Sequence, residues 1–575
     1  MRWSFDDSYV DFDSEIFTSS FENLKAQNEN LVKFLNNKEL TKAIISYEEA
    51  YKEAASLLAF CRCKSSDNTK DELASKFELK IKEQKARLDT VKEILFDKFD
   101  SLKSDDKIFQ STQFKHIKFL YLEHKNSKSK IRKKSERDFF ANLALTNFFP
   151  LFANFRHLNN LINISATNKN TNTQSYNLAK CMGILKGSDD EILRKNVFDG
   201  LSSHYDKFAD LYLDILNMLH GFRLARFKAA KVDFLTPSLE ENKMSLDTLN
   251  AMQEAISQRV EKIRECVKVR ASFLGSKSMR SCDLLAPYPL SKHSEISHDE
   301  AIKIIKKALK PLGEDSFIKL MIDKHWIESD VRENKAGGAF FVSLPKFKQP
   351  RIFTTYMNTL SHLIQQAHEL GHAWHYYLMR DLPVLSTNFP MSLAESASTF
   401  NETLLRNELK KDDSLRVEIL WQELKSAANF LLHINVRYEF ETSFLKLRQK
   451  GQVSKKDAND LLKQAWDKFY KYSTSDVEEF LPYFKPHFYK TDNYIYNYPY
   501  SVGYLLSQFF LSEFKKDEAK FCKIYKQFLI ECGTKSVEEL VKKHFKKDTT
   551  KCEFWLIGID EALKNLDEFK KIMTV

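Results

Sequence analysis

A long proline-free stretch, Thr359 to Arg380 (TLSHLIQQAHELGHAWHYYLMR), constrains this chain more than any other feature of its sequence. Apolar residues recur in it at three- and four-residue spacing, which predicts one continuous helix. His368 and His372 are four residues apart, so they lie on the same face of that helix, one turn from each other. Both imidazoles can therefore reach one metal ion.

Two other residues of the same helix have different predicted roles. Glu369 lies about 100° around the helix from His368, so its carboxylate flanks the ion and can accept a proton from a water there. His375 lies two turns from His368, which is an axial rise of about 10.5 Å. On a straight helix, these two histidines cannot bind the same ion. We therefore predict that Glu369 is a general base and that His375 is a core or supporting residue.

A catalytic zinc ion usually has three protein ligands and one open position, so a third ligand is needed. The class of sites that takes a third histidine from the same motif is excluded, because His375 and Leu378 occupy the positions that would need glycine and histidine. A glutamate from a second helix is the remaining common solution.

The stretch Pro390 to Lys411 (PMSLAESASTFNETLLRNELKK) predicts such a helix. Its Glu395 is the predicted third ligand, and Glu402, two turns later, is predicted to hydrogen-bond a ligand histidine and fix its tautomer. An alternative is that Glu395 closes a capping box with Ser392. Pro390 argues against that alternative, because proline prefers the first helical position and would place the cap earlier.

The remainder of the chain predicts a mainly α protein. Gly and Pro number only 13 and 12 in 575 residues, and polar breaks separate segments of helical periodicity. The first third is expected to be a set of antiparallel helices, with the segment 165–175 (SATNKNTNTQS) as one of the breaks. The alternating aromatic and β-branched residues of 337–356 predict a small sheet next to the metal-binding helix. We expect two domains, residues 1–190 and residues 191–575.

Composition excludes several classes of partner. The net charge of +10 is a small excess of 89 basic over 79 acidic residues, and no nucleic-acid-binding motif accompanies it, so no nucleic-acid partner is expected. No stretch approaches the roughly 18 uninterrupted apolar residues of a membrane span. The eight cysteines form no CxxC pair and the N-terminal sequence lacks the pattern of a secretory signal, which predicts a reduced, cytoplasmic location.

Several motifs together resemble one known family. HELGHAWH, LAESASTFNE, CDLLAPYPL, HWIESDVRENKAGGAF and HFYKTDNYIYNYPYSVGYLLSQ, between Cys282 and Gln508, are similar to the oligoendopeptidase F branch of the thimet-type oligopeptidase family of zinc metallopeptidases. The resemblance implies a two-lobed helical zincin with a small β-sheet beside the HExxH helix and a deep substrate channel. It implies one Zn²⁺ per chain on His368, His372 and Glu395, with Glu369 as the general base.

The resemblance also implies groups that act on the substrate. His487 matches a histidine that stabilises the oxyanion together with a tyrosine, for which the matching run offers Tyr498 first and Tyr496 second. Substrate-binding residues are expected at Tyr494 and on an edge strand at Gly338 and Ala339. The run departs from the branch at residues 499–503, where PYSVG replaces the usual Ala-Thr-Gly, so the resemblance does not single out one tyrosine.

The expected function is hydrolysis of internal peptide bonds in short, unstructured oligopeptides. One alternative is a related helical metallocarboxypeptidase, which would need a cationic group for the free C-terminal carboxylate. Another is a helical scaffold that only binds zinc, and Glu369 argues against it because a structural zinc site needs no base. The sequence does not give the oligomeric state.

Overall fold

The computed structural model describes residues 1–131, 133–291 and 295–573, which form a mainly α fold with two small sheets, as the sequence predicts. Contacts divide the chain into two units, each assembled from three segments. The first unit comprises residues 1–127, 293–408 and 513–547, and the second comprises 128–292, 409–512 and 548–575. The expected division at residue 190 stays a prediction; these units divide the chain at other positions. Among the described residues, no helix has the length and apolar character to span a membrane.

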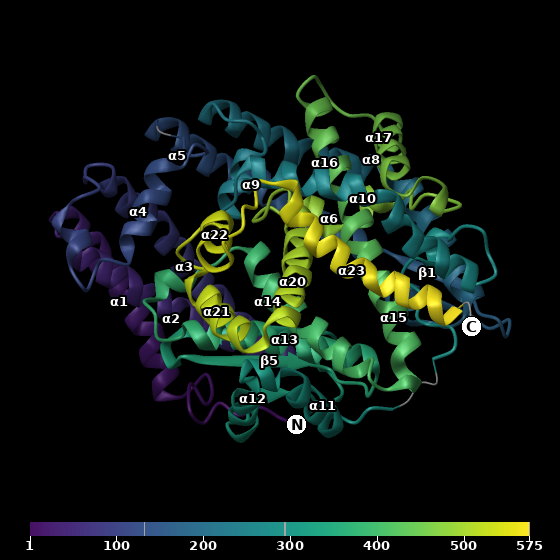
Figure 1. The fold of residues 1–575 in the computed structure, drawn as a ribbon. Coiled ribbons are helices and arrows are strands. Elements are labelled where there is room, and N and C mark those ends of the chain that lie inside the picture. Colours follow the sequence, from purple (N-terminus) through teal and green to yellow (C-terminus); the bar gives the residue numbers. More distant parts are fainter. Residues whose placement is uncertain (132, 292–294, 574–575) are drawn as a thin grey trace. The chain divides into compact units, whose positions relative to one another are not determined.

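The first unit contains ten helices of regular α type among its described residues, together with one sheet (Figure 1). The helices are α1 (Glu15–Asn36), α2 (Leu40–Asp67), α3 (Glu72–Phe99), α4 (Ile117–Asn126), α11 (His298–Leu309), α12 (Glu314–Asp323), α13 (Leu360–Met379), α14 (Met391–Leu409), α21 (Glu518–Glu531) and α22 (Val537–Phe545). The strands are β3 (Ile327–Glu328), β4 (Ala339–Leu344) and β5 (Gln349–Thr354).

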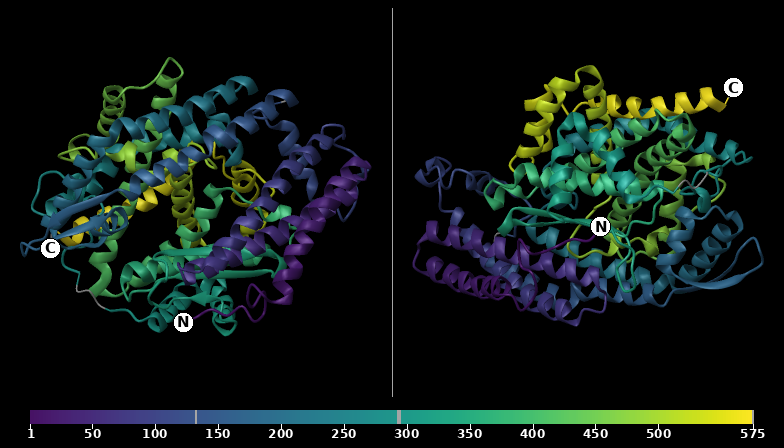
Figure 2. Two further views of the ribbon diagram at one scale, coloured as in Figure 1. Left: turned by 180° about the vertical axis from the view of Figure 1, so that it is seen from behind. Right: turned by 90° about the horizontal axis from the view of Figure 1, so that it is seen from below.

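Helices α1, α2 and α3 run side by side (Figure 2). The N-cap of α1 is Ser14, whose side chain accepts a hydrogen bond from the Phe17 amide. Buried residues then recur along α1 at helical spacing from Phe17 to Leu35, and they face the other two helices. The predicted antiparallel helices are therefore present in this segment.

The small sheet of the first unit lies where the alternating pattern predicts it. Strand β4 pairs antiparallel with β5, from Ala339 opposite Thr354 to Leu344 opposite Gln349. The short strand β3 pairs parallel with β5 on its other side, so β4 is an edge strand of this three-stranded sheet. Helix α13 packs on β4 and β5.

The N-terminal helices and the sheet share one hydrophobic core. Val342 and Leu344 of β4 belong to the same buried cluster as the apolar residues of α1, α2 and α3. The Lys346 ammonium, just after β4, lies 2.9 Å from a carboxylate oxygen of Glu53 on α2. The first hundred residues thus support the sheet on which the metal-binding helix rests.

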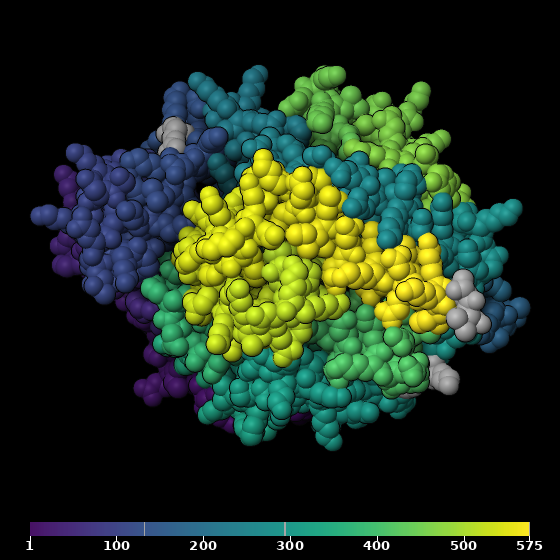
Figure 3. All heavy atoms as spheres, in the orientation of Figure 1, coloured from purple at the N-terminus to yellow at the C-terminus, as the bar shows by residue number. Residues whose placement is uncertain are grey.

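The second unit holds most of the remaining helices. They are α5 (Lys134–Leu143), α6 (Pro150–Asn160), α7 (Leu178–Gly187), α8 (Glu191–Ala230), α9 (Thr236–Glu241), α10 (Leu246–Phe273), α15 (Asp413–Ala428), α16 (Ile434–Arg448), α17 (Lys455–Phe469), α18 (Leu481–Phe484), α19 (Pro486–Tyr489), α20 (Tyr498–Lys516), whose last residues join the first unit, and α23 (Cys552–Met573). Helix α23 packs on α10 and α15 and its side chains reach the surface (Figure 3).

One polar break has more structure than the sequence analysis expected. Residues Asn163–Thr167 (β1) and Thr173–Asn177 (β2) form an antiparallel hairpin. Ile164 and Ala166 are buried, and β1 packs on α8, where a Cβ at Gly200 would overlap Ile164 Cγ2. The hairpin forms because alternate residues of β1 find an apolar partner surface, which a local reading of the polar turn does not reveal.

Candidate metal centre

Helix α13 presents both predicted histidine ligands from one face. Its N-cap is Thr359, whose side chain accepts from the His362 amide, and the preceding Asn358 takes a left-handed φ of 55°. The Nε2 atoms of His368 and His372 lie 3.2 Å apart. Two nitrogens bound to one tetrahedral zinc at about 2.1 Å lie roughly 3.4 Å apart, so this spacing fits a shared ion.

The third predicted ligand comes from the neighbouring helix α14. Glu395 Oε2 lies 3.5 Å from His368 Nε2 and accepts a hydrogen bond of 3.0 Å from the Ser398 hydroxyl. One ligand atom from each of His368, His372 and Glu395 lies within 4.8 Å of the others. Glu395 is 8% exposed, so its carboxylate is taken from water into a site where a cation would compensate its charge.

A glycine allows the two helices to approach so closely. A Cβ at Gly371 of α13 would lie 2.8 Å from Ser398 Cα and 2.9 Å from the Ala397 carbonyl oxygen of α14. Any side chain at this position would push α14 away. Gly371 therefore sets the distance between Glu395 and the two histidines.

Glu402 holds His368 in the required orientation. Its Oε1 lies 2.6 Å from His368 Nδ1, and its Oε2 accepts a hydrogen bond of 2.6 Å from Arg406. Because the carboxylate receives the Nδ1 proton, the Nε2 lone pair of His368 points toward His372 and Glu395. The structure thus brings Glu402 to the position that the sequence analysis predicted.

Glu369 lies beside the ligands and is 7% exposed. Burial raises the pKa of Glu369 to about 7; the interaction with His368 lowers that pKa, and the neighbouring Glu395 raises it. The Arg62 guanidinium of α2 acts on it as well, and Arg62 lies over the Phe340 ring of β4, 3.9 Å from the ring centroid. A buried carboxyl next to the ligand histidines has the position that a proton acceptor needs.

His375 belongs to the core, as its place on the helix predicts. It is fully buried, its Nε2 lies 3.1 Å from the Leu529 carbonyl oxygen, and its ring stacks on Phe389 at 4.0 Å. It belongs to neither of the two groups of possible metal ligands found among the described residues.

The expected substrate strand lies on the same unit. Gly338 has a φ of 95°, a conformation that favours glycine, and its carbonyl oxygen accepts from the Thr355 amide at 3.0 Å. Ala339 then begins β4. The ring of Phe341 on β4 lies 6.4 Å from that of His372, which places the edge strand next to the ligand helix.

The predicted oxyanion residues lie in the second unit, where the structure groups only some of them. The His487 ring stacks on Tyr496 at 5.9 Å, and His487 Nε2 lies 3.4 Å from the Tyr500 hydroxyl. Burial, followed by the charges of Arg437 and Lys485, lowers the pKa of His487 to about 3, so the imidazole is neutral near pH 7.

The two other predicted tyrosines, Tyr498 and Tyr494, have partners other than His487. Tyr498 is fully buried, and its hydroxyl donates to the Ser238 carbonyl oxygen and accepts from the Ser238 hydroxyl, both at 3.1 Å. Tyr494 is 8% exposed and lies under the Arg223 guanidinium, 4.8 Å from the ring centroid.

Sequence reasoning missed Tyr500 and Arg62. Tyr500 lies in the tyrosine run, but Tyr496 precedes α20, so no helical spacing linked the two residues in the sequence. Arg62 carried no signal, because only the fold brings α2 to the edge strand.

Residues 314–560 match the model of Peptidase family M3. This segment, less than half of the chain, is similar to that family. It contains His368, Glu369, His372, Glu395 and His487, and the resemblance to the oligoendopeptidase F branch is confirmed by relatives of that name. Oligopeptidase PepF of Bacillus subtilis is 25% identical over 372 residues, which cover 62% of this chain and 54% of the relative. Chromosomal oligoendopeptidase F of Lactococcus lactis subsp. cremoris is 24% identical, over 57% of this chain and 55% of the relative. The matches thus span about half the length of these relatives.

Solved structures share the fold over nearly the whole chain. A putative peptidase from Chlamydophila abortus is 19% identical with a TM-score of 0.79, covering 99% of this chain and 98% of its own. Oligoendopeptidase-F from Enterococcus faecium is 18% identical with a TM-score of 0.71, and the match covers 97% of this chain and 99% of that structure. The likeness in fold therefore includes the N-terminal residues in which the sequence shows no motif.

Proposed function

We propose that this chain is a zinc-dependent endopeptidase that hydrolyses internal bonds of short, unstructured oligopeptides in the cytoplasm. The observation that carries the proposal is the convergence of His368, His372 and Glu395, with Glu369 beside them, in a segment of Peptidase family M3. The names of the relatives and the eight free cysteines support the substrate class and the reducing compartment.

The donor set fits zinc because two imidazoles and one carboxylate are its usual ligands in hydrolytic sites. A zinc ion held there supplies a Lewis acid for the scissile carbonyl and lowers the pKa of water toward neutrality. Glu402 keeps His368 Nε2 free to bind the ion, and Arg406 holds Glu402 in place. Gly371 keeps Glu395 within reach.

The reaction then depends on proton transfer by Glu369. One of its carboxylate oxygens accepts a proton from the attacking water, and the same carboxyl delivers it to the departing amine. The substrate backbone adds to the free edge of β4 at Gly338 and Ala339 as an extra strand. A neutral His487 and a tyrosine hydroxyl donate hydrogen bonds to the oxyanion of the tetrahedral intermediate, a role that rests on the family resemblance.

The contacts in the second unit refine the choice of tyrosine. Tyr496 and Tyr500 touch His487, whereas the Tyr498 hydroxyl already bonds Ser238. We place Tyr496 and Tyr500 beside His487 in the proposal and keep Tyr498 and the substrate contact at Tyr494 as further candidates. The deep channel implied by the resemblance stays a prediction, and it limits substrates to extended chains.

Mass spectrometry of a peptide-library digest tests the proposal. We expect internal fragments from peptides of up to a few tens of residues, no cleavage with a chelator, and recovery when Zn²⁺ is restored. Release of single C-terminal residues would favour the carboxypeptidase alternative. Cleavage that a chelator leaves unchanged would contradict the proposal.

A further inference from the structure

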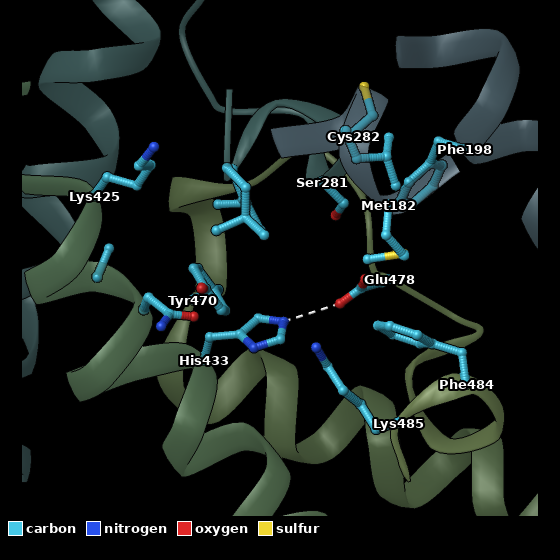
Figure 4. Close-up of a pocket in the computed structure, with 15 residues that line it drawn as sticks. Met182, Phe198, Ser281, Cys282, Lys425, His433, Tyr470, Glu478, Phe484 and Lys485 are labelled. Carbon is cyan, nitrogen blue, oxygen red and sulfur yellow. Dashed lines mark hydrogen bonds and ion pairs between the residues drawn. The ribbon is translucent and has the colours of Figure 1, made fainter. Parts of the chain in front are cut away.

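A second polar site lies in a pocket of the second unit (Figure 4). None of the described residues that line this pocket is a candidate metal ligand. Its walls come from α7, α8, the short helix at Ser281–Asp283, the end of α15 and the segment before α19. Its cavity volume is about 30 Å³, and a single water needs roughly 10–15 Å³ on this measure. The pocket therefore has room for two or three waters or for one small ion.

A chain of hydrogen bonds along one wall fixes the charges there. Arg437 Nη2 lies 2.7 Å from His433 Nδ1, and His433 Nε2 lies 2.9 Å from Glu478 Oε2. A guanidinium can only donate, so Nδ1 accepts, and Nε2 carries the proton that it donates to Glu478. His433 is thus neutral, in agreement with a pKa lowered to about 4 by burial and by Arg437. Arg437 and Glu478 balance each other's charge.

The π-helical turn Asn429–His433 (η7) brings His433 to this wall. Such turns are rare and occur frequently at functional sites. The Asn429 side chain, from the same turn, also lines the pocket and has an amide N–H to donate.

Lys485 has no hydrogen-bonded partner among the described residues. Its ammonium points into the pocket between His433 and Glu478 (Figure 4). No carboxylate or other acceptor within the described part of the chain lies at hydrogen-bond distance from it, and it packs on the Phe484 ring at 4.4 Å. Burial, followed by repulsion from Arg437, lowers the pKa of Lys485 well below its usual value.

The other groups of the wall do not supply the missing negative charge. Lys425 also lines the pocket, and Lys186 adds a further repulsive charge to Lys485. Among the described residues that line the pocket, the one carboxylate is Glu478; its charge raises the pKa of Lys485, but it already accepts a hydrogen bond from His433. A half-buried ammonium against Phe484 loses part of its hydration, and a bound anion would add a compensating charge.

We propose that this pocket binds one small monovalent anion, such as chloride or formate, against Lys485 and next to the Arg437–His433 pair. The cavity volume excludes bulkier anions such as a nucleotide or a phosphorylated peptide. The thermal-unfolding test of this site does not depend on peptidase activity, although Arg437 and Lys485 also influence the pKa of His487.

Thermal unfolding of the full-length protein at constant ionic strength tests this proposal. Sodium chloride or sodium formate is titrated against sodium gluconate, whose anion is too bulky for the pocket. We expect a saturable rise in Tm with either small anion for the parent and for Lys463→Met, which removes an exposed lysine of α17. In Lys485→Met the saturable rise should be absent, whereas Lys485→Arg, which keeps a cation, should retain it.

A further difference separates an anion site from a structural lysine. In gluconate alone, Lys485→Met should have a higher Tm than the parent, because a poorly compensated charge has been removed. Equal anion responses in Lys485→Met and Lys463→Met would overturn the proposal, as would a response that never saturates. The tripeptide triglycine also carries a carboxylate, but the whole molecule is too large to enter the pocket. If triglycine raised the Tm as much as formate does, and only when Lys485 is present, the site would bind peptide ends instead of small free anions.

Discussion

Gly371 of α13 lies against Ser398 of α14, and a Cβ at residue 371 would come 2.8 Å from the Ser398 Cα. The contact is between backbones, so a rotamer change cannot relieve it. It sets the spacing of the two helices that carry His368, His372 and Glu395.

Gly371→Ala should therefore lower both stability and metal content. The added methyl group forces α14 outward, and overpacking of this kind costs about 1–3 kcal/mol. Urea unfolding and elemental analysis measure the two effects. Gly183→Ala in α7 is the matched control, because a Cβ there meets nothing within 4 Å. The control should gain up to about 1 kcal/mol from the better helix propensity of alanine. A Gly371→Ala protein as stable and as metal-rich as the parent would refute this role.

The sequence indicated the ligands because helical spacing alone fixes the geometry of His368 and His372, and one further glutamate was needed. It did not indicate how closely α14 approaches. A glycine inside a strong helical pattern was the available signal, since such a residue costs about 1 kcal/mol and needs a packing reason.

Tertiary contacts explain what the sequence left out. The hairpin at residues 163–177 depends on α8, and the shared core of α1, α2, α3 and β4 joins segments more than two hundred residues apart. The Tyr498 hydroxyl finds Ser238, 260 residues earlier in the chain, which no local pattern reveals.

Glu395→Ala and Glu402→Ala should separate ligand from supporting roles. Loss of Glu395 removes a metal ligand, so zinc content and turnover should both fall sharply. Loss of Glu402 removes the hydrogen bond to His368 Nδ1, which should weaken zinc affinity by about 10- to 100-fold. Elemental analysis at matched free zinc measures both variants. Full zinc occupancy in Glu395→Ala would remove this residue from the ligand set.

Phenylalanine substitutions should distinguish the tyrosines. If Tyr496 or Tyr500 donates to the oxyanion, its loss should lower kcat by roughly 10²-fold or more with little change in KM or Tm. Tyr498→Phe breaks the contacts with Ser238, so it should lower Tm with kcat near normal. Steady-state kinetics and thermal unfolding of the three variants give the comparison. A large kcat loss in Tyr498→Phe alone, with unchanged Tm, would assign the hydroxyl to Tyr498.

Glu314 on α12 should make stability depend on pH. It is fully buried, accepts a 2.9 Å hydrogen bond from Asn401, and burial raises its pKa to about 8. Because the folded state holds this proton more tightly than the unfolded state, its contribution to stability is complete below about pH 4.5 and is lost as pH rises toward 8.

Glu314→Gln removes that dependence and keeps an oxygen for Asn401. Relative to the parent, the variant should gain up to about 4 kcal/mol between pH 5 and pH 9. Paired urea unfolding curves at the two pH values provide the measurement. The same stability difference at both pH values would show that Glu314 does not titrate in this range.

The most direct test of the account is to measure zinc content and turnover on one preparation of Glu369→Gln. The amide keeps the shape of the side chain and leaves His368, His372 and Glu395 intact, but it cannot accept a proton from water. We predict zinc content equal to the parent's, and cleavage of a short peptide reduced by about 10²-fold or more, as expected when a general base is lost. A fully metal-loaded variant with turnover within tenfold of the parent would contradict the proposed mechanism.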